Sequence, residues 1–316
     1  MPNPALTLPR ADAPVDWRER TDWVKTSDGH ELALRTVEAP QLAGARPALL
    51  MLHGLFSDGR FFLNARHEGP GRHFLDRGHR IHIGELRAHG QSRWPSGRRQ
   101  WNWGFDELVR HDLPALIEAV TERETGPVFV VAHSIAGYAL LASLGCQTLL
   151  QQRLGGVCLL SSAVNDYSEL GWRKRAAFHA SALIARSMGR FPAKALGVGV
   201  SDEPPALIRQ FVRWAPTHGF FGDDGTDYWQ ALGQVKVPVF AGVGSADRFH
   251  ASVASGQRLV AALGSADRTF VELGPRNGLR RDYGHVDVLR GAGARTEVLP
   301  RLAEWIDHRT VTPSGD

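Results

Sequence analysis

The chain has 316 residues, of which 43% are hydrophobic, 22% charged and 9% aromatic, a composition that excludes a disordered or fibrous protein. The formal net charge of +4 is mild and spread along the chain, so we expect no nucleic-acid partner. Only two cysteines occur, Cys146 and Cys158, which excludes a disulfide-built scaffold and favours a reducing compartment.

The chain opens with a lead-in over residues 1–18 that lacks the apolar core of a signal peptide. Together with the low cysteine content, this predicts a cytoplasmic protein. Strands and helices then alternate. The predicted strands cover residues 22–25, 31–37, 47–53, 79–86, 128–132, 157–161, 237–243 and 269–273. The predicted helices cover residues 105–124, 135–150, 252–263 and 297–308. Such alternation is typical of an α/β fold with a doubly wound, mostly parallel sheet and helices on both faces.

Residues 126–152 contain no Asp, Glu, Lys or Arg, a length that would suffice for a membrane span of about 20 residues. The internal pattern argues against a span. Residues 127–131 are rich in β-branched and aromatic side chains, and His133, Ser134 and Gly137 then interrupt the apolar run. A buried strand followed by a buried helix explains this pattern, so we expect no membrane span.

Residues 166–234 break the alternation, because they show no clear apolar strand and have a helical pattern. We expect a helical cap here, inserted into a core formed by residues 19–165 and 235–316. Aromatic side chains in this segment either pack the cap onto the sheet or line an apolar acyl pocket: Trp172, Phe178, Phe211, Trp214, Phe220, Phe221 and Trp229. A basic run is either a solvated face or a contact for an acidic acyl group: Arg173, Lys174 and Arg175.

The segment from Ala132 to Ala136 joins a predicted strand directly to a predicted helix, with Ser134 at its centre. A serine on such a turn holds its hydroxyl above the sheet, and the next backbone N–H, here that of Ile135, points at the same space. Alanine stands at the two positions where the G-x-S-x-G pattern has glycine, and it is small enough to allow the turn. The alternative interpretation is a serine that caps a buried helix.

Other reactive groups also follow predicted strands, where ligands of parallel sheets bind. The loop after strand 47–53 places the N–H of Leu55 as a second donor to an oxyanion. Asp247 follows strand 237–243, and His285 lies beyond the last strand. The order of Ser134, Asp247 and His285 along the chain is the order in which α/β-hydrolases carry their triads.

These features together resemble the α/β-hydrolase superfamily over residues 23–309. The segment Ala88-His89-Gly90-Gln91-Ser92 is similar to the G-H-G-x-S loop that many members carry after their fourth strand. The segments His53-Gly54-Leu55-Phe56 and Tyr283-Gly284-His285-Val286-Asp287 resemble the acid-lipase-like branch, whose members hydrolyse carboxylic esters. The resemblance implies a serine esterase or lipase.

In this interpretation Ser134 is the nucleophile, His285 is its base, and Asp247 orients the imidazole. Asp166 is a rival position for the acid, because some α/β-hydrolases draw it from the strand before the cap. An acyltransferase or a C–C-bond hydrolase would use the same triad, and the sequence leaves both open. A non-catalytic binding module is disfavoured, because the nucleophile and the base are both present.

We expect the substrate pocket beside the oxyanion loop, lined by His53, Gly54, Phe56 and His133. Asp287, two residues after the base, is expected to bond its own loop. The histidines show no metal-ligand spacing and no glycine-rich phosphate motif follows a strand, so we expect neither a metal nor a cofactor. The expected partner is a small acyl ester, and nothing in the sequence indicates the oligomeric state.

Overall fold

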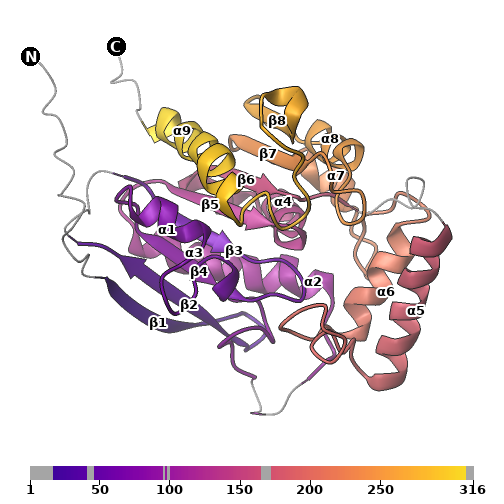
Figure 1. The fold of residues 1–316 in the computed structure, drawn as a ribbon. Helices are drawn as coiled ribbons and strands as arrows, with labels where there is room; N and C mark the ends of the chain where they lie inside the picture. Colours follow the sequence, from indigo (N-terminus) through magenta and orange to yellow (C-terminus); the bar gives the residue numbers. More distant parts are fainter. Residues whose placement is uncertain (1–16, 41–45, 95–96, 98–99, 165–171, 311–316) are drawn as a thin grey trace, which may run out of the picture.

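The computed structural model describes residues 17–40, 46–94, 97, 100–164 and 172–310, without the side chains of residues 173 and 174 (Figure 1). Eight strands in these ranges form one sheet in the order β1-β2-β4-β3-β5-β6-β7-β8. Their bounds are β1 (Arg18–Lys25), β2 (Glu31–Glu38), β3 (Ala48–Leu52), β4 (Ile81–Gly84), β5 (Val128–His133), β6 (Leu154–Leu160), β7 (Val239–Gly244) and β8 (Arg268–Leu273). β1, β2 and β4 pair antiparallel and all other neighbours pair parallel.

The α-helices are α1 (Pro70–Leu75), α2 (Phe105–Glu107), α3 (Leu113–Arg123), α4 (Ile135–Cys146), α5 (Trp172–Met188), α6 (Pro205–Trp214), α7 (Tyr228–Leu232), α8 (Val253–Ala261) and α9 (Leu299–Thr310). Short 3₁₀ segments lie at η1 (Gly59–Phe61), η3 (Thr148–Arg153) and η5 (Pro275–Asn277), and π turns at η2 (Leu108–Asp112) and η6 (Ala294–Val298). Each predicted strand and helix has a counterpart. The main differences lie at the ends: the predicted strand 79–86 narrows to β4, and the predicted helix 135–150 leaves the α conformation at Gln147 and continues as η3.

The central strands are apolar along their whole length because helices cover both faces of the sheet. In β3, Leu50 and Leu52 pack in the cluster that contains α3 and α4, whereas Leu49 and Met51 pack in the cluster that contains α1 and α9. Figure 1 shows α1 and α9 on the same face. The predicted α/β fold with a doubly wound, mostly parallel sheet is therefore confirmed.

The segment between β6 and β7 carries α5, α6 and α7, and Figure 1 shows α5 and α6 beside the sheet rather than on one of its faces. Its aromatic side chains serve mainly in packing. Trp214 and Phe220 both contact Phe105 of the core, at ring distances of 4.9 and 5.5 Å. Asp166, the rival acid, lies outside the described residues, as do the side chains of Arg173 and Lys174.

The uncharged stretch at residues 126–152 is divided between β5, α4 and η3. No helix within the described ranges combines the length and the apolar character that crossing a bilayer requires.

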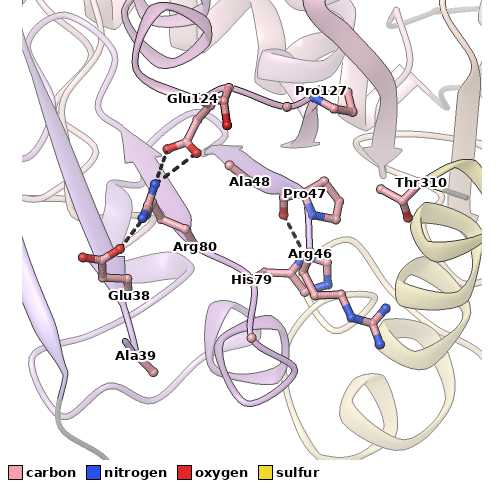
Figure 2. A pocket seen from close by; sticks show the side chains of 13 residues that line it. Glu38, Ala39, Arg46, Pro47, Ala48, His79, Arg80, Glu124, Pro127 and Thr310 are labelled. Atoms are coloured by element: carbon pink, nitrogen blue, oxygen red, sulfur yellow. Dashed lines mark hydrogen bonds and ion pairs between the residues drawn. The ribbon is translucent and has the colours of Figure 1, made fainter. Parts of the chain in front are cut away.

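A polar hollow of about 360 Å³ lies at the amino-terminal end of the parallel strands, beside the start of β3 (Figure 2). Arg80 donates there to Glu38 at 2.6 Å and to Glu124 at 3.1 Å. His79 Nδ1 lies 2.9 Å from the carbonyl oxygen of Pro47. This hollow is at the opposite edge of the sheet from the carboxyl ends of the strands, where the predicted reactive groups lie.

Candidate active site

Ser134 occupies the sharp turn between β5 and α4 with a φ of +56°, which non-glycine residues rarely adopt. Its neighbours hold this conformation. The Ser134 N–H donates to the carbonyl of Leu160 at 2.9 Å. The Ser134 carbonyl accepts from the N–H of Gly137 at 3.0 Å and from Ser162 Oγ at 2.9 Å. The backbone is therefore fixed on both sides of the hydroxyl.

The turn forms with alanine at the two positions that usually hold glycine. Ala132 and Ala136 are both fully buried beside it. A close approach to the serine itself comes from Gly54, where a Cβ would lie 2.9 Å from the Cβ of Ser134. The arrangement therefore requires glycine at position 54, because it lets the loop after β3 contact the serine.

His285 links Ser134 to Asp247 by two hydrogen bonds. Its Nε2 lies 3.0 Å from Ser134 Oγ, and its Nδ1 lies 2.6 Å from Asp247 Oδ2. An ionised carboxylate can only accept, so Nδ1 carries the proton of the neutral ring and Nε2 is left to accept from the serine hydroxyl. The three side chains follow β5, β7 and β8, and meet because parallel strands end at one edge of the sheet.

Asp247 is held as a carboxylate in a buried position. Burial raises the pKa of its carboxyl, but the hydrogen bond and charge interaction with His285 and the N–H groups of Ala251 and His250 outweigh burial. The pKa of Asp247 therefore lies below its usual value. The two N–H groups donate to Oδ1 at 3.2 and 3.1 Å, which leaves Oδ2 for His285.

His133 supports the site from beneath. Its Nε2 lies 2.9 Å from the carbonyl oxygen of His285, and its ring stacks on Phe61 at 4.6 Å. Burial, together with the neighbouring His285, lowers the pKa of His133 to about 3. His133 is therefore neutral near pH 7, donates through Nε2, and fixes the backbone of His285.

The two predicted oxyanion donors remain available. Within the part of the chain that the structure describes, neither the N–H of Leu55 nor that of Ile135 donates a hydrogen bond to another protein group. The N–H of the next residue, Phe56, is by contrast engaged with Glu203 Oε1 at 2.8 Å.

A cleft of about 490 Å³ opens over Ser134 and His285. It is lined by the loop after β3, by the loop after β8, and by residues 198–200 of the segment between α5 and α6. Phe56 and His133 line it, whereas His53 and Gly54 are not among its lining residues. His53 is fully buried behind the loop, where its Nδ1 lies 2.9 Å from the carbonyl oxygen of Gly54 and supports the loop.

A family model described as the alpha/beta hydrolase family matches residues 49–301, well over half of the chain. The chain belongs to this family. The resemblance predicted from the sequence is thereby confirmed.

Curated relatives of this alpha/beta hydrolase include two lipases. Triacylglycerol lipase 1 of Arabidopsis thaliana is 31% identical over 122 residues, which cover 35% of this chain and 30% of the lipase. Lipase member N of Mus musculus is 26% identical over 143 residues, which cover 42% of this chain and 36% of the lipase. The match thus spans about a third of the length of each relative.

Solved structures agree on the fold. An esterase of Pyrococcus furiosus superposes with a TM-score of 0.61 at 14% identity, covering 93% of this chain and 91% of the esterase. A bromoperoxidase of Bacillus anthracis superposes with a TM-score of 0.61 at 15% identity, covering 91% of this chain and all of the other. The different names illustrate that this fold alone does not fix the reaction.

The hydrolase also contains site residues that the sequence did not indicate. His250 lies with its ring 4.5 Å from that of His285. Arg290 lines the cleft, and Glu203 holds the backbone of Phe56. Asp287, as expected, accepts from the N–H of Gly284 at 2.5 Å and shapes the loop that carries the imidazole. Among the described residues, no group of three or more His, Cys, Asp or Glu side chains is arranged to hold a metal ion.

His89, in the loop after β4, forms a buried ion pair with Glu203. Its Nε2 lies 3.0 Å from Glu203 Oε1, and its Nδ1 lies 2.7 Å from the carbonyl oxygen of Arg87. Burial lowers the pKa of His89, but the charge and hydrogen bond of Glu203 outweigh burial and raise that pKa to about 9. Residues 88–92, which resemble a loop of the α/β-hydrolases, therefore contain the histidine that pairs with Glu203 in the segment between β6 and β7.

This pair predicts a pH-dependent stability. Because the pKa of His89 is higher in the folded than in the unfolded chain, its stabilisation is complete below pH about 6.5 and is lost as the pH rises through about 9. We expect the free energy of unfolding to fall from pH 7 to 9 by at most about 3 kcal/mol. Urea unfolding at both pH values measures this fall. It should shrink in Glu203→Gln, and equal falls in variant and wild type would contradict the assignment.

Proposed function

We propose that this alpha/beta hydrolase cleaves carboxylic esters through an acyl-enzyme on Ser134. The observation that carries the proposal is the chain of hydrogen bonds from Ser134 through His285 to Asp247. The similarity to lipases supports an ester as the substrate class. The proposed substrate is a small acyl ester that enters the cleft over the serine.

The chemistry follows from the protonation of the imidazole. Ser134 Oγ attacks the ester carbonyl carbon while its proton passes to His285 Nε2, and the resulting imidazolium is stabilised by Asp247. The same proton then passes to the leaving alkoxide, which departs as an alcohol and leaves the acyl-enzyme. Water, deprotonated by His285, attacks the acyl carbonyl, and the acid is released as Ser134 recovers its proton.

The backbone N–H groups of Leu55 and Ile135 are the proposed donors to the oxyanion of both tetrahedral intermediates. Their availability, together with the contact between Gly54 and Ser134, supports this role. Loss of one such donor typically lowers kcat by about 10²- to 10³-fold. Ile135 has the further advantage of the helix amino terminus, whose dipole favours negative charge.

We assign residues 166–234 to a cap over the core formed by residues 19–165 and 235–316. Two observations support this division: α5 and α6 lie beside the sheet, and residues 198–200 form part of the cleft wall. In this assignment the segment between α5 and α6 contributes to substrate selection, while α6 and α7 attach the cap to the core through Phe105.

A panel of p-nitrophenyl esters from acetate to laurate tests the proposal. We expect saturable release of p-nitrophenol for at least one acyl length, with water as the acyl acceptor. Absence of hydrolysis across the panel would contradict the proposal. Transfer of the acyl group to an added alcohol in preference to water would instead identify an acyltransferase that uses the same triad.

A further inference from the structure

Two arginines line the cleft, and only one of them is paired. The Arg60 guanidinium contacts both carboxylate oxygens of Asp58 through Nε and Nη2, at 2.6 Å for the closest pair, so its charge is already paired. The guanidinium carbon of Arg290 lies 5.6 Å from the centre of the Phe61 ring. Among the described residues no carboxylate lies within ion-pair distance of Arg290, whose side chain is exposed.

Arg290 is close to the reaction centre. Phe61, which it overlies, also stacks on His133, and the His133 ring lies 4.9 Å from that of His285. The Phe61 ring therefore contacts both the Arg290 guanidinium and His133, and His133 in turn contacts His285 beside Ser134. Ser134, Phe61 and Arg290 all line the same cleft.

The surroundings of Arg290 are electropositive. A second hollow, of about 680 Å³, adjoins the cleft and shares Asn64 and Arg290 with it. Arginines outnumber carboxylates in its lining, with Arg72, Arg77, Arg290 and Arg295 against Glu68 and Asp76. A concave surface with an excess of one charge concentrates ligands of the opposite charge.

We propose that the substrate carries a carboxylate in addition to its scissile ester, and that Arg290 binds this carboxylate. The inference rests on the proposed function, because the carboxylate belongs to the same ester that Ser134 attacks. A guanidinium presents a planar fork of donors that matches a carboxylate, and of the two arginines that line the cleft Arg290 is the one without a carboxylate partner among the described residues. A purely apolar acyl chain would supply no anion to the Arg290 guanidinium.

Kinetics on a matched pair of esters test the proposal: p-nitrophenyl butyrate, which is neutral, and mono-p-nitrophenyl glutarate, which adds a carboxylate. We expect a lower KM for the glutarate ester, and in Arg290→Gln a rise of about tenfold or more in the ratio of the glutarate KM to the butyrate KM. Arg276→Gln is the control, because Arg276 is 85% exposed and lines neither hollow. Unchanged glutarate kinetics in Arg290→Gln would overturn the carboxylate subsite and leave the proposed function standing.

Binding separates this inference from the proposed function. Calorimetric titration of free glutarate into wild type and Arg290→Gln needs no turnover. Binding to wild type that weakens about tenfold or more in the variant supports the subsite even if no ester is hydrolysed. No binding to wild type, or equal binding to both, would overturn it.

A second inference concerns the loop that carries Leu55, and different contacts support it. The backbone of Phe56, with a φ of +59°, is bonded on both sides to the segment between α5 and α6. Its N–H donates to Glu203 Oε1 at 2.8 Å. Its carbonyl accepts from the N–H groups of Val200 and Ser201, at 2.6 and 3.2 Å.

Glu203 is fixed in turn. The same Oε1 is bonded to His89, and its backbone pairs with that of Phe191 at 2.7 and 3.1 Å. The Glu203 side chain is completely buried. Burying a carboxylate destabilises the folded chain unless the carboxylate is paired. Glu203 Oε1 lies between the charged His89 and the N–H of Phe56, whose φ is positive, and this placement indicates that Glu203 holds the Phe56 backbone.

We infer that Glu203 is a positioning residue for the Leu55 N–H. The Phe56 N–H belongs to the peptide plane that follows Leu55, and a peptide plane is rigid. Holding that plane limits how far the preceding N–H can rotate away from Ser134. This inference also rests on the proposed function, since it concerns the geometry of the oxyanion site.

Two substitutions test the role. In Glu203→Leu, we expect kcat to fall about 10- to 100-fold with KM within about twofold, because the transition state loses more than bound ester does. Affinity for an alkyl trifluoromethyl ketone, which forms an oxyanion on the serine, should fall in parallel. Glu203→Gln should lose less, because its amide oxygen still accepts from Phe56. Asp202→Asn is the control, since Asp202 bonds Arg190 and Lys194 instead.

Active-site titration with a fluorophosphonate corrects each rate for unfolded protein. If both Glu203 variants retain wild-type kcat and ketone affinity per titrated site, with only a lower Tm, Glu203 is purely structural and the inference fails. A Glu203→Leu chain that does not fold leaves the Gln variant to decide, through the same kcat and ketone comparison. An inactive wild type would instead contradict the proposed function.

Discussion

Replacing Ser134 by alanine is expected to lower kcat for ester hydrolysis by about 10⁴- to 10⁶-fold, to the level that binding and the oxyanion donors alone provide. The serine hydroxyl is the atom that becomes acylated, and no other group in the turn can take its place. Its hydrogen bond to His285 is the contact that is lost, so the fold should persist. Initial rates on the best ester of the panel and a thermal unfolding curve measure both effects.

Ser134→Gly is the matched control for stability. Both variants lack the hydroxyl, but glycine adopts the φ of +56° without strain. We therefore expect Ser134→Gly to be more stable than Ser134→Ala by about 1 kcal/mol, with the same loss of activity. Retention of more than a hundredth of wild-type kcat in either variant would show that another nucleophile carries the reaction.

Asp247→Asn is expected to lower kcat by about 10³- to 10⁴-fold with a small effect on KM. An asparagine presents either its oxygen or its NH₂ group to His285 Nδ1, and it lacks the charge that stabilises the imidazolium. The loss therefore falls on the step in which the ring takes the proton. Steady-state kinetics on the same ester give kcat and KM separately.

Asp282→Asn serves as the control, because Asp282 bonds Ser245 at 2.7 Å and not the imidazole. If Asp247→Asn keeps a tenth or more of wild-type kcat, the acid lies elsewhere, and Asp166 is the first position to substitute. A fall in Asp166→Asn of the size expected for Asp247→Asn would identify Asp166 as the acid.

The contact between Ser134, His285 and Asp247 was predictable because it depends on a simple regularity. Parallel strands end at one edge of the sheet, so residues in the segments that follow β5, β7 and β8 can meet there. Ser134 and Asp247 lie 151 and 38 positions from His285 along the chain. The hydrophobic pattern located those strands with errors of a few residues, which the prediction tolerates. The order of the three residues then named the family.

Other parts of the site were not predictable, because irregular segments supply them. Glu203 contacts Phe56 across 147 positions from a stretch with no periodic pattern, and this contact depends on how the segment between β6 and β7 packs. Nothing in the sequence distinguishes Arg290 from the other arginines, because only the structure shows that Arg290 lines the cleft. The sequence places His53 at the strand end, but only side-chain packing decides that its side chain is buried.

The covalent step itself is the most direct test of the account. Wild-type protein is treated with an alkyl fluorophosphonate, and the adduct is located by mass spectrometry of the tryptic peptide covering residues 124–153. We expect a single adduct on Ser134 that is absent in Ser134→Ala and forms far more slowly in His285→Ala. An ester-hydrolysing protein that carries the adduct on another residue, or that reacts equally fast without His285, would contradict the account.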